Sequence, residues 1–302
     1  MAATQTQPVG ANPGVRPIDA RPGTLKLLLA NRVAVGAGLV TLGFVLVALL
    51  APMLSPYNPA EQHPEAIRVP PFWSPGGSTR FLLGTDGLGR DLLSRILFGS
   101  RVSILLGVVV VLLTLVVGAC LGMLAGYYRG WVDTLLSRVV DTLLAFPFLI
   151  FALAIMAVTG PNLVALVLAL AFKGWVDFFR VARGDVLAAR ESEYVLAARG
   201  VGASNAYILF GEILPNIVPP LIVLAALRMA TVIIAEASLS FLGIGVPPRI
   251  PAWGTMVADG RGSIATAWWI ATFPGLAILL LVLSVNLLGE GLRDALDPRM
   301  RR

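Results

Sequence analysis

The sequence predicts an all-α integral membrane protein with six transmembrane helices. Its 302 residues are 57% hydrophobic and only 13% charged, whereas a soluble domain carries about 25% charged residues. Six apolar stretches, most of them close to the twenty residues that a membrane-spanning helix needs, recur along the chain. A polar segment, Glu191–Asn216, separates the fourth stretch from the fifth.

The composition also excludes several classes of function. The net charge of +6 fits the excess of Lys and Arg on the cytoplasmic loops of membrane proteins, and we expect no nucleic acid partner. Cys120 lies in an apolar run and His63 in a Pro-rich loop, which leaves no disulfide framework and no metal site. The sequence has no Walker-type phosphate-binding loop, so we expect any ATP to bind to another chain.

The first 32 residues predict a cytoplasmic N-terminal tail, flexible over residues 1–24, which are rich in Pro, Gly, Thr and Gln. The first span runs from Val33 to about Leu54. It is longer than the apolar core of a signal peptide, and four basic residues precede it, so we expect an uncleaved helix with its N-terminus in the cytoplasm.

A Pro-rich extracytoplasmic interval follows and completes a first unit, residues 33–101. It ends in Leu83-Gly-Thr-Asp-Gly-Leu-Gly-Arg-Asp-Leu-Leu-Ser-Arg95. The Gly and Asp residues predict a turn, and the apolar spacing after them predicts a helix. Two interpretations remain open: an amphipathic interfacial helix that leads into the next span, or a functional role for the segment.

Residues 102–302 form the second unit. Its first span, Val102–Leu124, carries Gly118, Gly122 and Gly126 on one face, as in helices that pack closely inside a membrane. A short loop over residues 127–138 follows. The remaining spans are expected at Val139 to about Thr159 with Pro147 inside it, Leu163–Phe179, Ile217–Leu239 and Ala267–Leu288.

The polar segment Glu191–Asn216 predicts an elbow between the fourth and fifth spans. A short helix is expected from Glu191 to about Gly200, with Ser192 as its N-cap. Gly202 ends this helix, and Pro215 marks the return to the membrane. A helix–glycine–helix elbow between two spans is a surface against which a partner can dock.

The distribution of basic residues predicts the orientation in the membrane. With six spans, the segments on the side of the termini and the elbow carry 14 Lys and Arg residues, and the opposite segments carry 7. Positive charge accumulates on the cytoplasmic side. We therefore expect both termini and the elbow in the cytoplasm.

Four ionisable residues fall within the predicted spans. Lys173 and Asp177 are four residues apart on one helix and are expected to pair. Arg228 and Glu236 are eight residues apart, or roughly 12 Å along a helix, and cannot pair with each other. Their partners must come from other helices or from a second subunit, and the sequence favours such structural pairing over contact with a substrate.

Three separated motifs resemble the membrane subunits of ABC importers. The elbow, Glu193–Ser204 followed by Ile213–Asn216, is similar to the EAA loop of those subunits. The segment Leu83–Arg95 resembles the signature of the dipeptide, oligopeptide and nickel permeases, and of the C-type subunit in particular. Glu236–Gly245 and Pro251–Gly254 resemble the same branch. The resemblance covers about residues 30 to 298, and its signature positions are Gly84, Thr85, Asp86, Gly89, Arg90 and Asp91.

The resemblance implies a type I importer fold and no enzymatic activity in this chain. It also implies a multi-pass protein of the cytoplasmic (inner) membrane of a bacterium or archaeon. The implied partners are a B-type permease, two ATPase subunits that hold ATP and Mg, an extracytoplasmic binding protein, and membrane lipid. The implied cargo is a peptide. The coupling helix would seat in a groove of the ATPase, and the coupling residues would be Glu193, Ala197, Ala198, Arg199, Gly202, Ala203, Leu214 and Pro215.

The elbow departs from the family pattern at two positions. Leu196 stands where the family usually has glutamate, and Glu212 where it usually has isoleucine. Docking on the ATPase therefore cannot depend on a glutamate at position 196. We expect the small residues Ala197, Ala198 and Gly202 to make the contact with the ATPase groove.

Alternative functions remain within and outside this class. Close relatives of such permeases carry nickel chelates, glutathione or oligosaccharides, and the sequence does not choose among these cargoes. A secondary transporter would be expected to show inverted repeats, which are not evident here. A membrane enzyme would need a nucleophile with its base, or metal ligands, and one histidine and one cysteine do not supply them.

Overall fold

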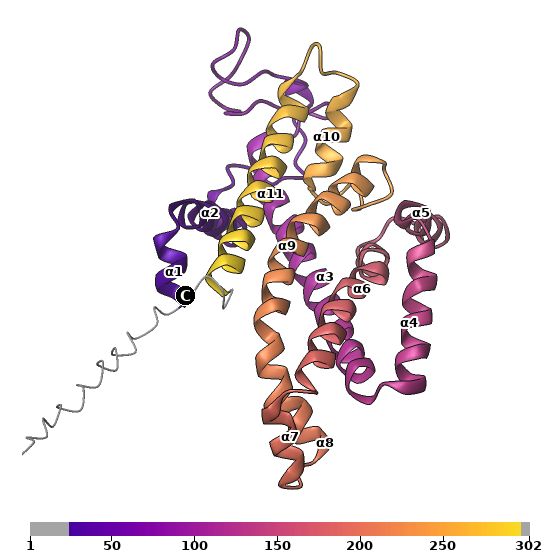
Figure 1. Cartoon of the computed structure of the whole chain (residues 1–302). Coiled ribbons are helices and arrows are strands. Elements are labelled where there is room, and N and C mark those ends of the chain that lie inside the picture. Colours follow the sequence, from indigo (N-terminus) through magenta and orange to yellow (C-terminus); the bar gives the residue numbers. More distant parts are fainter. Residues whose placement is uncertain (1–23, 297–302) are drawn as a thin grey trace, which may run out of the picture.

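The computed structural model describes residues 24–296, and helices make up most of that length (Figure 1). The prediction of an all-α membrane protein is confirmed. The helices are α1 (Thr24–Ala30), α2 (Arg32–Leu54), α3 (Leu92–Tyr128), α4 (Gly130–Ala145), α5 (Phe148–Thr159), α6 (Leu163–Ala189), α7 (Glu193–Gly200), α8 (Asn205–Tyr207), α9 (Leu214–Phe241), α10 (Trp253–Arg261) and α11 (Trp269–Leu296), with a 3-10 turn at Pro64–Ala66 and a π-helical segment at Ile208–Ile213.

The chain is already helical before the first span, within the region that the sequence assigns to a tail. α1 ends at Ala30, and Asn31 then caps α2 because its side-chain oxygen accepts hydrogen bonds from the N–H groups of Val33 and Ala34, both at 3.1 Å. Residues 1–23 of the expected tail lie outside the described part. α2 packs beside α11, where Thr41 Oγ1 donates to Ser284 Oγ at 3.1 Å.

The second span is longer than predicted. α3 is one helix of 37 residues that begins at Leu92, so the expected interfacial helix is the first part of the span and not a separate element. Asp91 caps it, since its Oδ2 accepts the N–H of Ser94 at 2.8 Å. The short loop expected over residues 127–138 is wrong, because α4 begins at Gly130 after a turn at Arg129, which has a φ of 56°.

The glycine face of α3 packs closely against α6, as the sequence predicts. A Cβ atom built on Gly118 would lie 2.3 Å from the carbonyl oxygen of Trp175, and one on Gly122 would lie 2.5 Å from that of Phe179. Side chains at these positions would separate the two backbones. Without a hydrophobic effect inside the bilayer, this close approach is what holds the helices together.

We predict that Gly122→Val destabilises the protein by about 1–3 kcal/mol, as overpacking of a well-packed core does. The thermal unfolding of the purified protein in detergent measures the change. Gly43→Val, in α2, is the matched control, because nothing lies within 4 Å of a Cβ atom built at Gly43. Equal stability of the two variants would contradict the packing argument.

The third expected span is broken. α4 and α5 meet at an angle of 85°, and Pro147 lies at the bend as the N-cap of α5. Proline removes a backbone donor and cannot continue the preceding helix. The carbonyl oxygen of Phe146, which ends α4, instead accepts a hydrogen bond from Lys173 Nζ at 3.2 Å.

Within the described residues, four helical segments are long and apolar enough to cross a membrane: α2, α3, the segment Asn205–Phe241 and α11. The bent pair α4–α5 makes a fifth if it is one span. The fourth expected span corresponds to α6, whose 27 residues pack along α3 but include charged side chains from Lys173 onward.

The fifth span also begins earlier than predicted. Helical structure continues from Asn205 to Phe241 through the π-helical segment, and Pro215 lies in the first turn of α9, where proline is tolerated. The second half of the predicted elbow is therefore the N-terminal end of this long helix. In Figure 1 the elbow forms the tip of the molecule opposite the 55–91 loop and α10.

Candidate functional site

The elbow is built from one short helix and one tight turn. α7 begins at Glu193 and not at Glu191, and Ser192 stands at its N-cap position. The Ser192 hydroxyl donates to the carbonyl oxygen of Ala189, so it does not cap α7 with its side chain as predicted. Gly202 has a φ of 78°, a conformation that favours glycine. The predicted break at Gly202 is confirmed.

Buried apolar side chains hold the elbow on the helix bundle. Val195 is fully buried and belongs to the same core cluster as Ile208 and Ile213, and Ala198 packs against this cluster. Tyr127, near the end of α3, adds a polar contact because its hydroxyl donates to Asn205 Oδ1 at 2.7 Å. The elbow is therefore a fixed surface whose displacement must move the helices below it.

The elbow also has several large apolar side chains that are exposed. Val201 is 86% exposed and Phe210 60% exposed, and Leu196 is also exposed. Ala197 lies exposed next to Leu196, and Gly202 is exposed beyond them. Large apolar side chains gathered on an exposed surface are characteristic of a protein interface.

The structure separates the predicted coupling residues into two groups. Ala197, Gly202 and Pro215 are exposed, as is Glu193. Ala198, Ala203 and Leu214 are partly buried and pack against the core cluster.

Arg199 also lies on the inner side of the elbow. Its guanidinium carbon is 5.5 Å from the centre of the Tyr127 ring, a cation–π contact. The structure thus gives Arg199 a contact within the chain, and its expected role in coupling stays a prediction. Sequence reasoning missed Tyr127, because nothing in the pattern of α3 points to a residue so far away in the chain.

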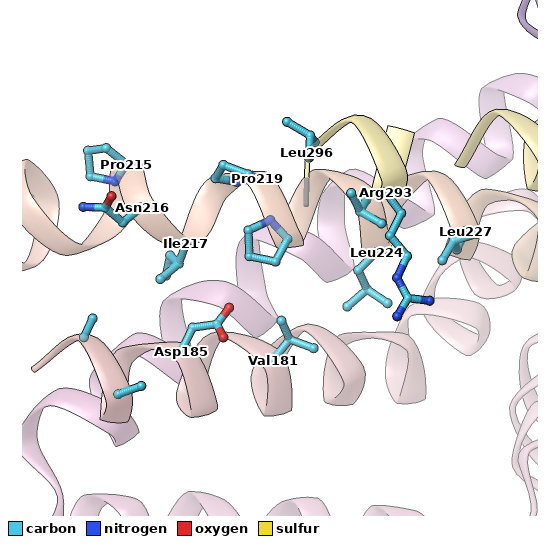
Figure 2. Close-up of a pocket in the computed structure, with 14 residues that line it drawn as sticks. Val181, Asp185, Pro215, Asn216, Ile217, Pro219, Leu224, Leu227, Arg293 and Leu296 are labelled. Carbon is cyan, nitrogen blue, oxygen red and sulfur yellow. The ribbon is translucent and has the colours of Figure 1, made fainter. Parts of the chain in front are cut away.

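A cavity of about 920 Å³ lies at the base of the elbow, between α6, α9 and α11. Figure 2 shows the side chains of Asp185 and Arg293 among mostly apolar residues that line it. Asp185 Oδ2 is buried and has no hydrogen-bond partner among the described residues. The cavity therefore borders α6 and α9, the two helices that carry the elbow.

The signature residues form the base of the 55–91 loop. Gly84 and Gly89 have φ values of 83° and 73°. Cβ atoms at these positions would lie 2.5 Å from the carbonyl oxygen of Val69 and 2.1 Å from that of His63. Only glycine fits such a conformation with backbone so close. These two signature glycines let the loop fold back on itself.

The charged signature residues form a buried network. Asp86 Oδ2 accepts from Arg90 Nε at 2.6 Å and lies 3.6 Å from Arg95 Nε. The network reaches α10 through Arg90 Nη2 and Asp259 Oδ2, which are 3.4 Å apart. Burial raises the pKa of Asp91 even though its carboxylate accepts hydrogen bonds from Ser94. Each charge has a partner, which is the condition for burying charges.

Two tryptophans join this region to the helices: Trp269 of α11 bonds to the loop, and Trp253 of α10 bonds to α3. Trp269 Nε1 donates to the carbonyl oxygen of Thr85 at 3.1 Å, and Trp253 Nε1 donates to that of Ile96 at 3.0 Å. The Thr85 hydroxyl itself donates to the carbonyl oxygen of Ala66 at 2.5 Å. The geometry therefore gives the signature residues a structural role in holding the 55–91 loop on α3, α10 and α11.

The ionisable residues inside the spans pair differently from the prediction. Asp177 pairs with Arg228 of α9, while Lys173 donates to the carbonyl oxygen of Phe146. The predicted Lys173–Asp177 pair is therefore absent. Glu236 is buried, and it accepts hydrogen bonds from Ser240 at 2.7 Å and Ser103 at 3.4 Å. Arg228 finds its partner on another helix, as expected.

Comparison with known families agrees with this geometry. Residues 118–302 match the family described as binding-protein-dependent transport system inner membrane component. Residues 24–71 match the N-terminal TM domain of oligopeptide transport permease C. The chain belongs to the binding-protein-dependent transport permeases. Members of this family are the membrane components of ABC importers, and ATP hydrolysis is carried out by separate subunits.

Curated permeases of this family are similar along most of the chain. The di/tripeptide transport system permease protein DppC of Pseudomonas aeruginosa is 45% identical over 90% of this chain and 89% of its own. The dipeptide permease DppC of Escherichia coli is 47% identical over 88% and 89%. The glutathione transport system permease protein GsiD of Pectobacterium atrosepticum is 42% identical over 90% and 89%.

A solved structure shares the fold of the permease. One chain of the MetNI methionine ABC transporter, described in inward-facing conformations, superposes with a TM-score of 0.56. It covers 67% of this chain and 96% of its own length at 17% sequence identity. The likeness supports the predicted type I importer fold.

Proposed function

We propose that this chain is the C-type half of a heterodimeric permease that imports peptides, with a B-type permease as the other half. The resemblance of Leu83–Arg95 to the C-type signature supports the subunit type, and the dipeptide permeases at 45% and 47% identity support the cargo. Glutathione is the second candidate cargo, since a glutathione permease is 42% identical. Glutathione is itself a tripeptide-like molecule.

The observation that carries this proposal is the elbow. It presents exposed apolar side chains and is locked to α3, α6 and α9. A groove on an ATPase subunit accommodates such a surface. Closure of two ATPase subunits around ATP and Mg would then push α7 and tilt α6 and α9, which changes access to the pathway.

The orientation and the other partners follow from the same arrangement. The elbow and both termini face the cytoplasm, and the 55–91 loop with α10 faces the opposite side. An extracytoplasmic binding protein delivers the peptide there. The chain holds no cofactor of its own, and ATP and Mg remain on the ATPase subunits.

Purification through a tag on this chain tests the proposal. We expect two ATPase subunits and a B-type permease to co-purify, and vesicles that contain the complex and its binding protein to take up a radiolabelled dipeptide only with ATP. Glutathione, a nickel chelate and an oligosaccharide serve as alternative cargoes. Uptake of glutathione and no dipeptide would select the second candidate cargo. Uptake of only the nickel chelate or the oligosaccharide would contradict the peptide assignment, and uptake without any ATPase would contradict the importer class.

A further inference from the structure

A second cavity lies within the membrane-spanning part, where α6 and α9 meet the bend between α4 and α5. Its volume is about 370 Å³, within the range of small-molecule sites. Its walls include three charged side chains, Lys173, Asp177 and Arg228, together with Thr114 and Thr231. A cavity in this position that contains charged groups differs from the apolar gaps that ordinary helix packing leaves.

The charged side chains of this cavity are accessible in the single chain. The side chain of Arg228 is 31% exposed and that of Asp177 34% exposed, although both lie within helices of the bundle. Contact between such charges and lipid acyl chains is costly, so ionisable residues in spans face protein or a water-filled path. This face of the bundle therefore borders either a polar pathway or another polypeptide, and not lipid.

The cavity carries an excess of positive charge. Asp177 is neutralised by Arg228, which leaves Lys173 as the cation without a counter-ion among the described residues. An ammonium group has three hydrogen-bond donors, and the carbonyl oxygen of Phe146 accepts only one of them, at 3.2 Å. The remaining donors of Lys173 are suited to an anionic oxygen.

We propose that Lys173 binds the free carboxylate of the transported peptide as it passes through the permease. The inference rests on the proposed function, because it takes a peptide as the cargo. Arg228 already pairs with Asp177, so the Asp177 carboxylate is not the partner of Lys173. The neighbouring Gly174 lets α6 pack closely on α3 at this point, since its Cβ would lie 2.8 Å from Thr114 Cγ2.

A purely structural role for Lys173 makes a different prediction. In that case the ammonium group serves only to satisfy the carbonyl oxygen that the bend at Pro147 leaves without a helical partner. Loss of Lys173 would then weaken the permease for every ligand alike. The carboxylate site predicts instead that the preference between ligands with and without a carboxylate disappears.

The test uses the complete importer in lipid nanodiscs without its binding protein, so that only the membrane subunits select the ligand. The probes are L-alanyl-L-alanine and L-alanyl-L-alaninamide, whose binding is measured by equilibrium dialysis. We expect the free acid to bind about tenfold or more tightly than the amide, as a charge-assisted hydrogen bond provides. Lys173→Gln should remove this difference, and Lys173→Arg should restore most of it.

Arg138→Gln is the matched control, because it removes one positive charge from an exposed position of α4 outside the cavity. It should leave the preference intact. Equal binding of both probes to the unaltered importer, no binding of either, or a preference that survives in Lys173→Gln would each overturn the inference. Failure of the proposed function would be seen in a different experiment, the uptake assay with the binding protein present, as the absence of ATP-dependent uptake.

Discussion

Replacing Ala197 by arginine is expected to abolish peptide uptake while the permease still inserts and pairs with its partner. Ala197 is exposed on α7, beside the exposed Leu196. A guanidinium group there would hold α7 away from any groove that fits an alanine. Loss of a central contact at an interface costs about 2 kcal/mol or more, which lowers the affinity for the ATPase at least about thirtyfold.

Three measurements check this result: uptake into vesicles, stimulation of ATP hydrolysis by the loaded binding protein, and co-purification of the ATPase subunits. All three should fall. Ala30→Arg is the matched control, because Ala30 is an exposed alanine at the end of α1, outside the elbow. If Ala197→Arg transports at the rate of this control, α7 is not the docking helix.

The Asp86→Ala substitution is expected to have the largest effect on stability. Asp86 accepts hydrogen bonds from the side chain of Arg90 at 2.6 Å and from the backbone N–H groups of Leu88 and Arg90. Its loss leaves Arg95, whose side chain is only 2% exposed, without its nearest carboxylate. Removing one partner of a buried ion pair costs about 3–5 kcal/mol.

Thermal unfolding in detergent and the amount of protein retained in the membrane report this loss. Asp86→Asn should have a smaller effect, because the amide oxygen can still accept the two backbone hydrogen bonds. Glu65→Ala is the control for an ion pair at the surface, since Glu65 and Arg80 are both largely exposed, and its effect should be small. An Asp86→Ala protein as stable as the Glu65→Ala protein would refute a structural role for the signature.

The sequence predicted the parts of the fold that depend on local composition. Apolar length predicted the spans, and the spacing of Gly118, Gly122 and Gly126 predicted a face that the structure places against α6. Gly202 predicted the break after α7 because only a few residues adopt a positive φ with ease. Each of these features depends on residues within a few turns of one helix, and a single sequence is enough to identify them.

The errors share a different cause. Residues 130–138 of the expected loop form the first part of α4. The polar residue Asp133 has its partner on α6, because Arg183 Nε and Nη2 donate to its two carboxylate oxygens at 2.5 and 2.7 Å. Asp177 pairs with Arg228 rather than with Lys173 because α9 brings a guanidinium group to it. Contacts between helices that are far apart in the chain determine which residues pair here. The spacing of residues along one helix carries no information about such contacts.

The same limit applies to the candidate site. Sequence reasoning placed Ala198 and Arg199 on the docking surface, yet the buried Val195 and the ring of Tyr127 turn both residues toward the bundle. The exposed apolar side chain of Val201 was not predicted as part of that surface.

One helical segment connects the elbow to α10: it runs from Asn205 to Phe241 and includes the π-helical turn Ile208–Ile213 and the internal prolines Pro219 and Pro220. Its 37 residues correspond to about 55 Å at 1.5 Å per residue. Its outer end touches α10 without clearance, since a Cβ atom on Gly254 would lie 2.4 Å from the carbonyl oxygen of Ala237. A tilt of about 10° around its midpoint would displace each end by about 5 Å. When this segment tilts as one body, a displacement of the elbow is therefore accompanied by a displacement of similar size beneath α10. In the same way, a displacement of α10 is transmitted to the elbow.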